Sequence, residues 1–137
     1  MKQKILFPVS KPSITSLEKK YVRDALNSGW LSEGKYIDQF EFKFSKFCGT
    51  QYAISCFNGT VALHLAYLAL ELKEKDEILV PEFTFIATIN AAKYIGANIK
   101  TVDLDPFDLN ISIDDLKKKI TSKTKAIVIT NVYGNPF

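Results

Sequence analysis

Three adjacent residues, Asn58, Gly59 and Thr60, have the side chains expected of an anion-binding turn. They separate a short apolar segment, residues 53–57, from an apolar stretch at residues 61–72. Apolar residues recur in that stretch at helical spacing, which predicts a helix beginning near Gly59. The first N–H groups of a helix lack internal partners and carry partial positive charge. Gly59 would let a ligand approach them and the Thr60 hydroxyl would add a donor, so the turn has the outline of a phosphate site.

The same residues also fit a plain strand-turn-helix connection in which Asn58 serves only as the helix N-cap. From these residues alone, both interpretations stay open. The predicted helix has one apolar stripe that includes Val61 and Leu65 and a second made of alanines. A helix that is apolar on two faces is expected to be buried inside a fold.

A second candidate for ligand contact is Trp30, the only tryptophan of the chain. It lies in a predicted loop between Gly29 and Gly34. A tryptophan in a loop either packs into a groove of the protein or contacts a ligand, and the sequence favours neither.

Around these residues the sequence predicts alternating helices and strands. An extended arm at residues 1–12 precedes a helix with a capping box at Thr15–Glu18, which ends near Asn27. We expect further helices at about 35–47, 86–95 and around 116–120, strands at 53–57, 78–80, 99–102 and 126–130, a surface turn at 73–77 and a last turn at 131–136. The aromatic stripe of the 35–47 helix is expected in the core. This alternation predicts an α/β fold with a parallel sheet covered by helices.

Composition sets broad limits on the function. The 137 residues are 47% hydrophobic with a net charge of +3, which suits one globular domain, or part of a larger one, and does not indicate a polyanionic partner such as nucleic acid. No apolar run approaches the roughly 18 residues of a membrane span. Cys48 and Cys56 match no metal or redox spacing, so we interpret both as reduced thiols of a cytoplasmic protein.

Five short motifs follow one another along the chain: Gly29–Ser32, Asn58–His64, Val80–Thr88, Asp103–Asp105 and Lys123–Ile127. Their order and spacing resemble one known family, the sugar aminotransferases of the DegT/DnrJ/EryC1/StrS family, and in particular its perosamine-synthase-like members. Nearly every residue from Lys11 onward takes part in this resemblance. It implies that residues 1–137 are the N-terminal part of the large domain of a fold type I enzyme that depends on pyridoxal 5′-phosphate (PLP).

The resemblance also implies roles for individual residues. Gly59 and Thr60 match the phosphate-binding turn of the family, and Phe85 matches the aromatic residue that stacks on the cofactor ring. Three further residues match the loop that borders the sugar site: Trp30, Leu31 and Ser32. The implied reaction transfers an amino group, from glutamate, to a keto-deoxy sugar carried by a nucleotide, in amino-sugar or cell-surface polysaccharide biosynthesis. A homodimer is implied for the full-length enzyme.

Two positions depart from these roles or add little to them. Asn131 stands where many members have histidine, which puts that polar contact in doubt. His64 follows the family pattern, but we expect an ordinary helix residue surrounded by its neighbours.

We also expect a truncated chain. The family's lysine that holds the cofactor and its aspartate that pairs with the pyridine nitrogen match no residue up to Phe137. No catalytic residue is therefore assigned, and we expect residues 1–137 alone to be inactive and poorly folded.

Three other interpretations compete with the aminotransferase. Asp103 and Asp105 could hold a divalent metal ion against a diphosphate, as in a nucleotide-sugar glycosyltransferase. That hypothesis leaves the other four motifs unexplained. A dinucleotide-binding domain is weaker still, because no Gly-x-Gly-x-x-Gly follows the first strand. The chain could also be a non-catalytic remnant.

Overall fold

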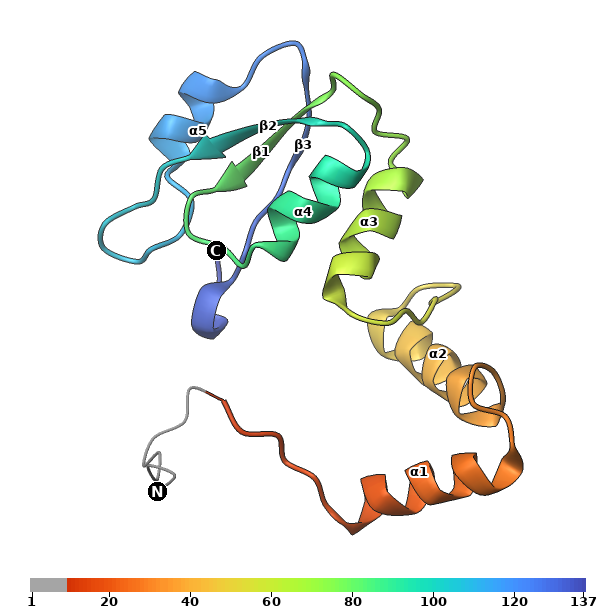
Figure 1. The fold of residues 1–137 in the computed structure, drawn as a ribbon. Coiled ribbons are helices and arrows are strands. Elements are labelled where there is room, and N and C mark those ends of the chain that lie inside the picture. Colours follow the sequence, from red (N-terminus) through yellow and green to blue (C-terminus); the bar gives the residue numbers. More distant parts are fainter. Residues whose placement is uncertain (1–9) are drawn as a thin grey trace, which may run out of the picture. The chain divides into compact units, whose positions relative to one another are not determined.

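The computed structural model describes residues 10–137, which divide into two compact units that meet in sequence at Ser55 and Cys56 (Figure 1). The first unit contains α1 (Ser16–Ser28) and α2 (Lys35–Cys48). Residues 10–15 form no helix or strand, and the rest of the predicted arm, residues 1–9, lies outside the described residues. No helix in the described part of the chain has the length and apolar character needed to cross a membrane.

Helix α1 begins with the predicted capping box. The Thr15 N–H donates to the Glu18 carboxylate at 2.6 Å, and the Leu17 N–H donates to the Thr15 hydroxyl at 3.2 Å. The helix ends at Gly29, whose φ of 74° is left-handed and suits glycine. The predicted bounds of this helix are therefore confirmed to within one residue.

Helix α2 forms where it was predicted, but the expected core position of its aromatic stripe is wrong in this structure. Phe40 and Phe44 stack with ring centroids 5.6 Å apart, yet both are exposed, and Phe47 is 88% exposed. Ser45 is the buried residue of this helix. Within residues 10–55 the only other helix is α1, so no further layer covers the stripe.

The second unit is built on a three-stranded parallel sheet with the order β2-β1-β3 (Figure 1). The strands are β1 (Glu77–Pro81), β2 (Asn98–Val102) and β3 (Thr124–Ile127). Helix α4 (Ala87–Tyr94) connects β1 to β2, and α5 (Ile113–Lys119) connects β2 to β3. Helix α3 (Gly59–Ala69) precedes the sheet, and a short 3₁₀ helix, η1 (Val132–Gly134), follows it. The predicted alternation of strands and helices is confirmed.

Strand β1 supplies the core of this unit, because all five of its residues are buried. Its side chains alternate between two faces. Ile78 and Val80 join an apolar cluster with residues of α3 and α4: Tyr67, Ala91 and Ala92. On the opposite face, Leu79 packs with Val102, Ile111 and Leu116 of α5. The sheet is thus covered by α3 and α4 on one face and by α5 on the other.

Two predictions around α3 need correction. Residues 53–57 form no strand, and the N–H and hydroxyl of Ser55 instead donate to the Glu41 carboxylate at 2.7 and 2.8 Å. A strand needs a neighbour to pair its backbone groups, and no described strand lies beside this segment. Helix α3 forms but is not buried all round: Tyr67 is its buried residue, whereas Leu65 and Leu68 are exposed.

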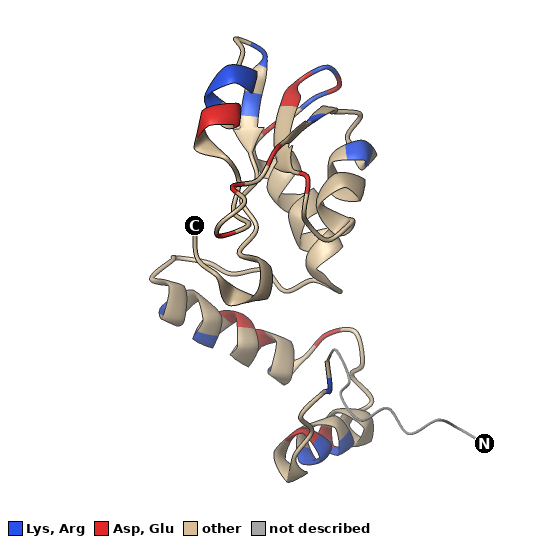
Figure 2. Cartoon of the chain, turned by 90° about the vertical axis from the view of Figure 1, so that its left-hand side faces the viewer, with Lys and Arg blue, Asp and Glu red and all other residues tan. Residues whose placement is uncertain are grey.

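Helix α5 shows how charge pattern and helix direction agree. Asp114 and Asp115 lie in its first turn and three lysines, Lys117 to Lys119, lie in its last turn (Figure 2). Acidic groups near the N-terminus and basic groups near the C-terminus complement the helix dipole. Lys119 pairs with Asp115 at 2.7 Å, which lowers the pKa of the Asp115 carboxyl.

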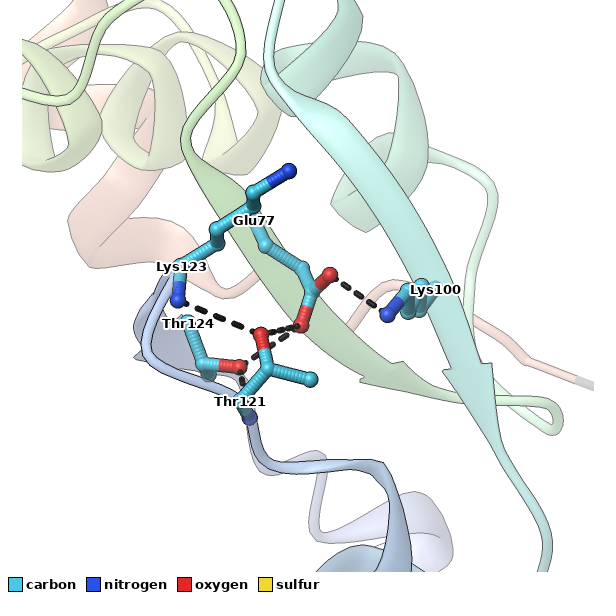
Figure 3. A network of polar contacts seen from close by, with 5 residues as sticks. All are labelled: Glu77, Lys100, Thr121, Lys123 and Thr124. Atoms are coloured by element: carbon cyan, nitrogen blue, oxygen red, sulfur yellow. Dashed lines mark hydrogen bonds and ion pairs between the residues drawn. The ribbon is translucent and has the colours of Figure 1, made fainter.

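The predicted position of Glu77 is also wrong. It was expected in a surface turn, but it is the first residue of β1 and only 2% exposed. Its carboxylate pairs with the Lys100 ammonium at 2.6 Å and accepts hydrogen bonds from the hydroxyls of Thr121 and Thr124 at 3.1 and 2.7 Å (Figure 3). One buried carboxylate therefore joins all three strands at the amino edge of the sheet. The pairing of β1 with β3 shifts register at the same place.

This network should make folding sensitive to acid. Lys100, followed by the Thr124 hydroxyl, lowers the pKa of the Glu77 carboxyl. The stability that this shift provides is present above the unfolded pKa of about 4.3 and is lost as the pH falls through the lowered folded pKa. We expect Glu77→Gln to lower the free energy of unfolding near pH 7 and to flatten its decline in acid, as measured by urea unfolding at a series of pH values. Glu71→Gln, which changes an exposed glutamate, is the control, and an equal effect of both variants would contradict the role of Glu77.

Candidate functional site

The N-terminus of α3 presents two backbone donors that no described residue uses. The side-chain oxygen of Asn58 accepts the Val61 N–H at 3.1 Å, and the backbone carbonyl of Asn58 accepts the Ala62 N–H at 3.0 Å. Within residues 10–137, the N–H groups of Gly59 and Thr60 and the Thr60 hydroxyl have no hydrogen-bond partner. Asn58 is thus the N-cap of α3, and this cap leaves free the donors that a phosphate would need.

Gly59 keeps the approach to these donors open. A methyl group placed on its Cα would meet no atom within 4 Å, and Gly59 does not have a positive φ. The backbone itself therefore does not require glycine here. A small residue at this position instead leaves room beside the first turn of the helix, where an oxyanion could contact the backbone.

Phe85 lies at the carboxyl edge of the sheet, between β1 and α4. Its side chain is 75% exposed, so a ring face is free to stack on a planar ligand. Its carbonyl accepts the Thr88 N–H at 3.0 Å, which begins the first turn of α4. This position suits contact with a ligand, since ligands of open α/β sheets bind at the carboxyl ends of the strands.

Three threonine hydroxyls beside Phe85 were not singled out from the sequence. Thr84 Oγ1 lies 3.0 Å from Thr88 Oγ1 and 3.0 Å from Thr130 Oγ1. The three residues come from the loop after β1, the first turn of α4 and the segment after β3. Thr130 is 46 positions from Thr84, so only the parallel pairing of β1 with β3 brings them together.

The loop with Trp30, Leu31 and Ser32 belongs to the first unit. Trp30 is 65% exposed and Leu31 is also exposed. Trp30 and Ser32 line a surface hollow of about 550 Å³ together with Glu33, Gly34, Lys35, Ile37 and Asp38. Gly34 has a φ of 114°, and a Cβ there would lie 3.3 Å from the Trp30 Cβ. Trp30 therefore borders a hollow of its own unit, and most of its side chain is exposed.

The two aspartates of the metal hypothesis serve as turn caps. The Asp103 carboxylate accepts the Leu104 N–H at 2.8 Å, and that of Asp105 accepts the Phe107 N–H at 2.8 Å. Among residues 10–137, no group of three or more His, Cys, Asp or Glu side chains could hold a metal ion. The position of both carboxylates is accounted for by hydrogen bonds within the loop that follows β2.

Four other residues singled out from the sequence have local contacts. His64 packs edge-on against Tyr94 with ring centroids 5.5 Å apart, as expected of an ordinary helix residue. The Asn131 side chain accepts the Phe137 N–H at 3.2 Å. Cys48 and Cys56 are free thiols, as predicted.

Comparison with known proteins decides the family. The model of the DegT/DnrJ/EryC1/StrS aminotransferase family matches residues 12–137, which include both the α3 turn and the Phe85 loop. The chain belongs to this family. The predicted resemblance is confirmed, and the family match gives no support to the glycosyltransferase alternative.

Individual relatives agree with the family assignment. The chain is 50% identical over 130 residues to GDP-perosamine synthase of Escherichia coli O157:H7, a match that covers 94% of this chain and 36% of that protein. It is 42% identical to GDP-perosamine synthase of Vibrio cholerae, which covers 94% of this chain and 35% of that protein.

A solved structure confirms the fold. E. coli GDP-4-keto-6-deoxy-D-mannose-3-dehydratase with bound hydrated PLP matches with a TM-score of 0.87 and 35% identity, over 97% of this chain and 36% of that chain. The α/β fold class with a parallel sheet is therefore that of family members known to bind PLP. The chain spans about a third of the length of the relatives it matches.

The cap of α3 can be tested by stability alone. Replacing an N-cap asparagine with alanine removes the acceptor of one N–H group, so Asn58→Ala should lower the free energy of unfolding by about 1 kcal/mol. Asn58→Asp keeps the acceptor and should lose much less. Urea unfolding measures the effect of both substitutions. If Asn58→Ala were as stable as the wild type, the cap would not set the start of α3.

Proposed function

We propose that the intact protein uses PLP to transfer an amino group, from glutamate, to a GDP-linked 4-keto-6-deoxy sugar. The observation that carries this proposal is the pair of unused N–H donors at Gly59 and Thr60, in a chain that is 50% identical to a GDP-perosamine synthase. Residues 1–137 would then be the N-terminal part of the PLP-binding large domain.

The residues of the second unit fit the two ends of this cofactor. Gly59 and Thr60 would hold the phosphate through two backbone N–H groups and one hydroxyl, and the positive end of α3 would favour its charge. Phe85 would stack on the pyridine ring with its exposed face. When bound, PLP supplies the electron sink that an amino transfer requires. The part of the protein described by residues 10–137 contributes binding and orientation to this chemistry.

The first unit would contribute to substrate binding. Trp30 and Ser32 line a hollow and Leu31 between them is exposed, which suits contact with the sugar nucleotide. An indole offers a flat apolar face and one N–H donor, and both are useful for a ligand that combines sugar, phosphate and base.

The setting of the reaction follows from its substrate. A GDP-linked amino sugar is an activated donor, so we propose a role in the biosynthesis of cell-surface polysaccharide. We place the protein in the cytoplasm, in keeping with its two free thiols. We further propose that the full-length enzyme is a homodimer.

A second function within the same family is 3-dehydration of the same class of sugar. The observation that favours it is the 36% identity to GDP-4-keto-6-deoxy-D-mannose 3-dehydratase of Escherichia coli O55:H7. The higher identity to the perosamine synthase favours amino transfer, and the product of the reaction separates the two.

The cofactor site predicts the effect of a single hydroxyl. A hydrogen bond to a charged group contributes roughly 1–3 kcal/mol, so Thr60→Ala should weaken PLP binding by that amount. Equilibrium dialysis with PLP on the intact protein measures the dissociation constant. Thr60→Ser retains the hydroxyl and should bind PLP nearly as the wild type does.

Gly59→Ala provides a matched test of the backbone donors. Alanine favours helix by about 1 kcal/mol over glycine and meets no atom here, so folding should be preserved or improved. PLP binding should nevertheless weaken, because the methyl group would occupy the approach to the N–H groups. Unchanged affinity in both Thr60→Ala and Gly59→Ala would remove this turn from the site.

The reaction itself predicts a defined product. Intact protein supplied with PLP, glutamate and GDP-4-keto-6-deoxymannose should form a GDP-linked amino sugar and 2-oxoglutarate in equal amounts. Mass spectrometry identifies the sugar, and EDTA should leave the rate unchanged. Formation of a 3-deoxy sugar instead would support the dehydratase, and activity that needed manganese would return attention to Asp103 and Asp105. A small panel of other keto-sugar nucleotides then defines the preferred base and sugar.

A further inference from the structure

Thr84 occupies a central position at the carboxyl edge of the sheet. It immediately precedes Phe85, and its hydroxyl is within 3.0 Å of the hydroxyls of both Thr88 and Thr130. Thr88 belongs to the first turn of α4, and Thr130 follows β3. One side chain therefore connects the loop after β1 to two neighbouring elements of the same unit.

The chemistry of hydroxyl groups makes Thr84 the member that both contacts need. A hydroxyl donates one hydrogen and accepts through its lone pairs, so Thr84 can donate to one neighbour while it accepts from the other. Loss of the Thr84 hydroxyl breaks both contacts in either arrangement. Loss of the Thr130 hydroxyl breaks only one.

The environment of Thr88 increases the importance of this contact. Thr88 is only 5% exposed, and Thr84 is the partner of its hydroxyl among the described residues. A threonine inside a helix often bonds to the carbonyl four residues earlier, but here the partner four residues earlier is the Thr84 side chain. Without the Thr84 hydroxyl, the buried Thr88 hydroxyl would lose the partner it has here, which disfavours the present loop conformation.

The same helix turn is also connected to α3. The Tyr67 hydroxyl donates to the Thr88 carbonyl at 3.4 Å, and Tyr67 is 3% exposed. Tyr67 belongs to α3, whose first residues are Gly59 and Thr60. Thr88 therefore contacts the helix that carries the phosphate turn through its carbonyl, and the loop that carries Phe85 through its hydroxyl.

We propose that Thr84 is a positioning residue that fixes the Phe85 loop against α4 and β3, and thereby holds the Phe85 ring at a set place relative to the N-terminus of α3. The ligand that benefits is the PLP of the proposed function, on which this part of the inference rests. The loop's dependence on Thr84 is a property of the protein without ligand.

The first experiment measures the loop directly. Thr84→Val preserves the branched shape and removes the hydroxyl. In the intact protein without PLP, hydrogen exchange should become about tenfold faster at the Thr88 amide, whose N–H donates to the Phe85 carbonyl; this factor corresponds to about 1.4 kcal/mol. Thr84→Ser retains the hydroxyl, so exchange at the Thr88 amide should stay near the wild-type rate. Thr130→Val should accelerate this exchange less than Thr84→Val does, because it breaks only one contact. Thr130→Val also keeps the inference testable if Thr84→Val does not fold.

A matched control separates positioning from general stability. Thr121→Val removes a threonine hydroxyl that donates to Glu77 at the opposite edge of the sheet. It should leave exchange at the Phe85–Thr88 segment unchanged. Equal acceleration in Thr121→Val and Thr84→Val, or no acceleration in Thr84→Val, would overturn the inference, as would a Thr84→Ser variant that behaves like Thr84→Val.

The second experiment connects the loop to the cofactor. The dissociation constant of PLP should rise about tenfold in Thr84→Val, with a change in the circular dichroism of the bound PLP, and remain near the wild-type value in Thr84→Ser and Thr121→Val. Faster exchange with unchanged PLP binding would overturn the positioning role. If the wild-type protein bound no PLP, the proposed function would fail, while the exchange measurements would still decide whether Thr84 holds the loop.

Discussion

The burial of β1 is the constraint on which the second unit depends. All five residues of this strand are buried, with Ile78 and Val80 on one face and Leu79 on the other. A strand that is covered on both faces must pair its backbone on both edges, because unpaired N–H and C=O groups in a core are costly. Strands β2 and β3 provide that pairing. Because Glu77 at the start of the strand is also buried, its carboxylate needs partners inside the protein. Lys100, Thr121 and Thr124 are these partners.

Local signals predicted part of the fold. The capping box at Thr15 and the N-cap at Asn58 each mark the start of a helix, and the structure has α1 and α3 at these places. The apolar run at 78–80 predicted the central strand because a short apolar segment between charged and proline residues suits a buried parallel strand. The strand predicted at 126–130 is found at Thr124–Ile127, a shift of about two residues at its start.

Long-range contacts account for what the sequence did not predict. Glu77 stands in a run of charged residues, so its composition indicated a surface turn, and only the positions of β2 and β3 make it a buried partner. Thr84 and Thr130 are ordinary threonines in sequence and become neighbours through strand pairing. The predictions of a strand at 53–57 and of a buried α3 were wrong for a related reason. The apolar character of a segment shows that it can be buried, but it does not show which other element packs against it. Gly59, Thr60 and Phe85 could be singled out from the sequence because they belong to short motifs, and their binding roles stay a prediction.

The two edges of the sheet use threonine hydroxyls in different ways. At the amino edge, Thr121 and Thr124 donate to a carboxylate that is also paired with a lysine, so this contact depends on the charge of Glu77. At the carboxyl edge, the Thr84 hydroxyl contacts those of Thr88 and Thr130, and none of the three titrates in the range where carboxylates do. Acid therefore acts on the first group and leaves the second intact until the sheet itself unfolds. The contacts that connect the loop before Phe85 to α4 and to the segment after β3 therefore depend on neutral hydrogen bonds, whereas the contacts that connect the three strands at Glu77 depend on charge.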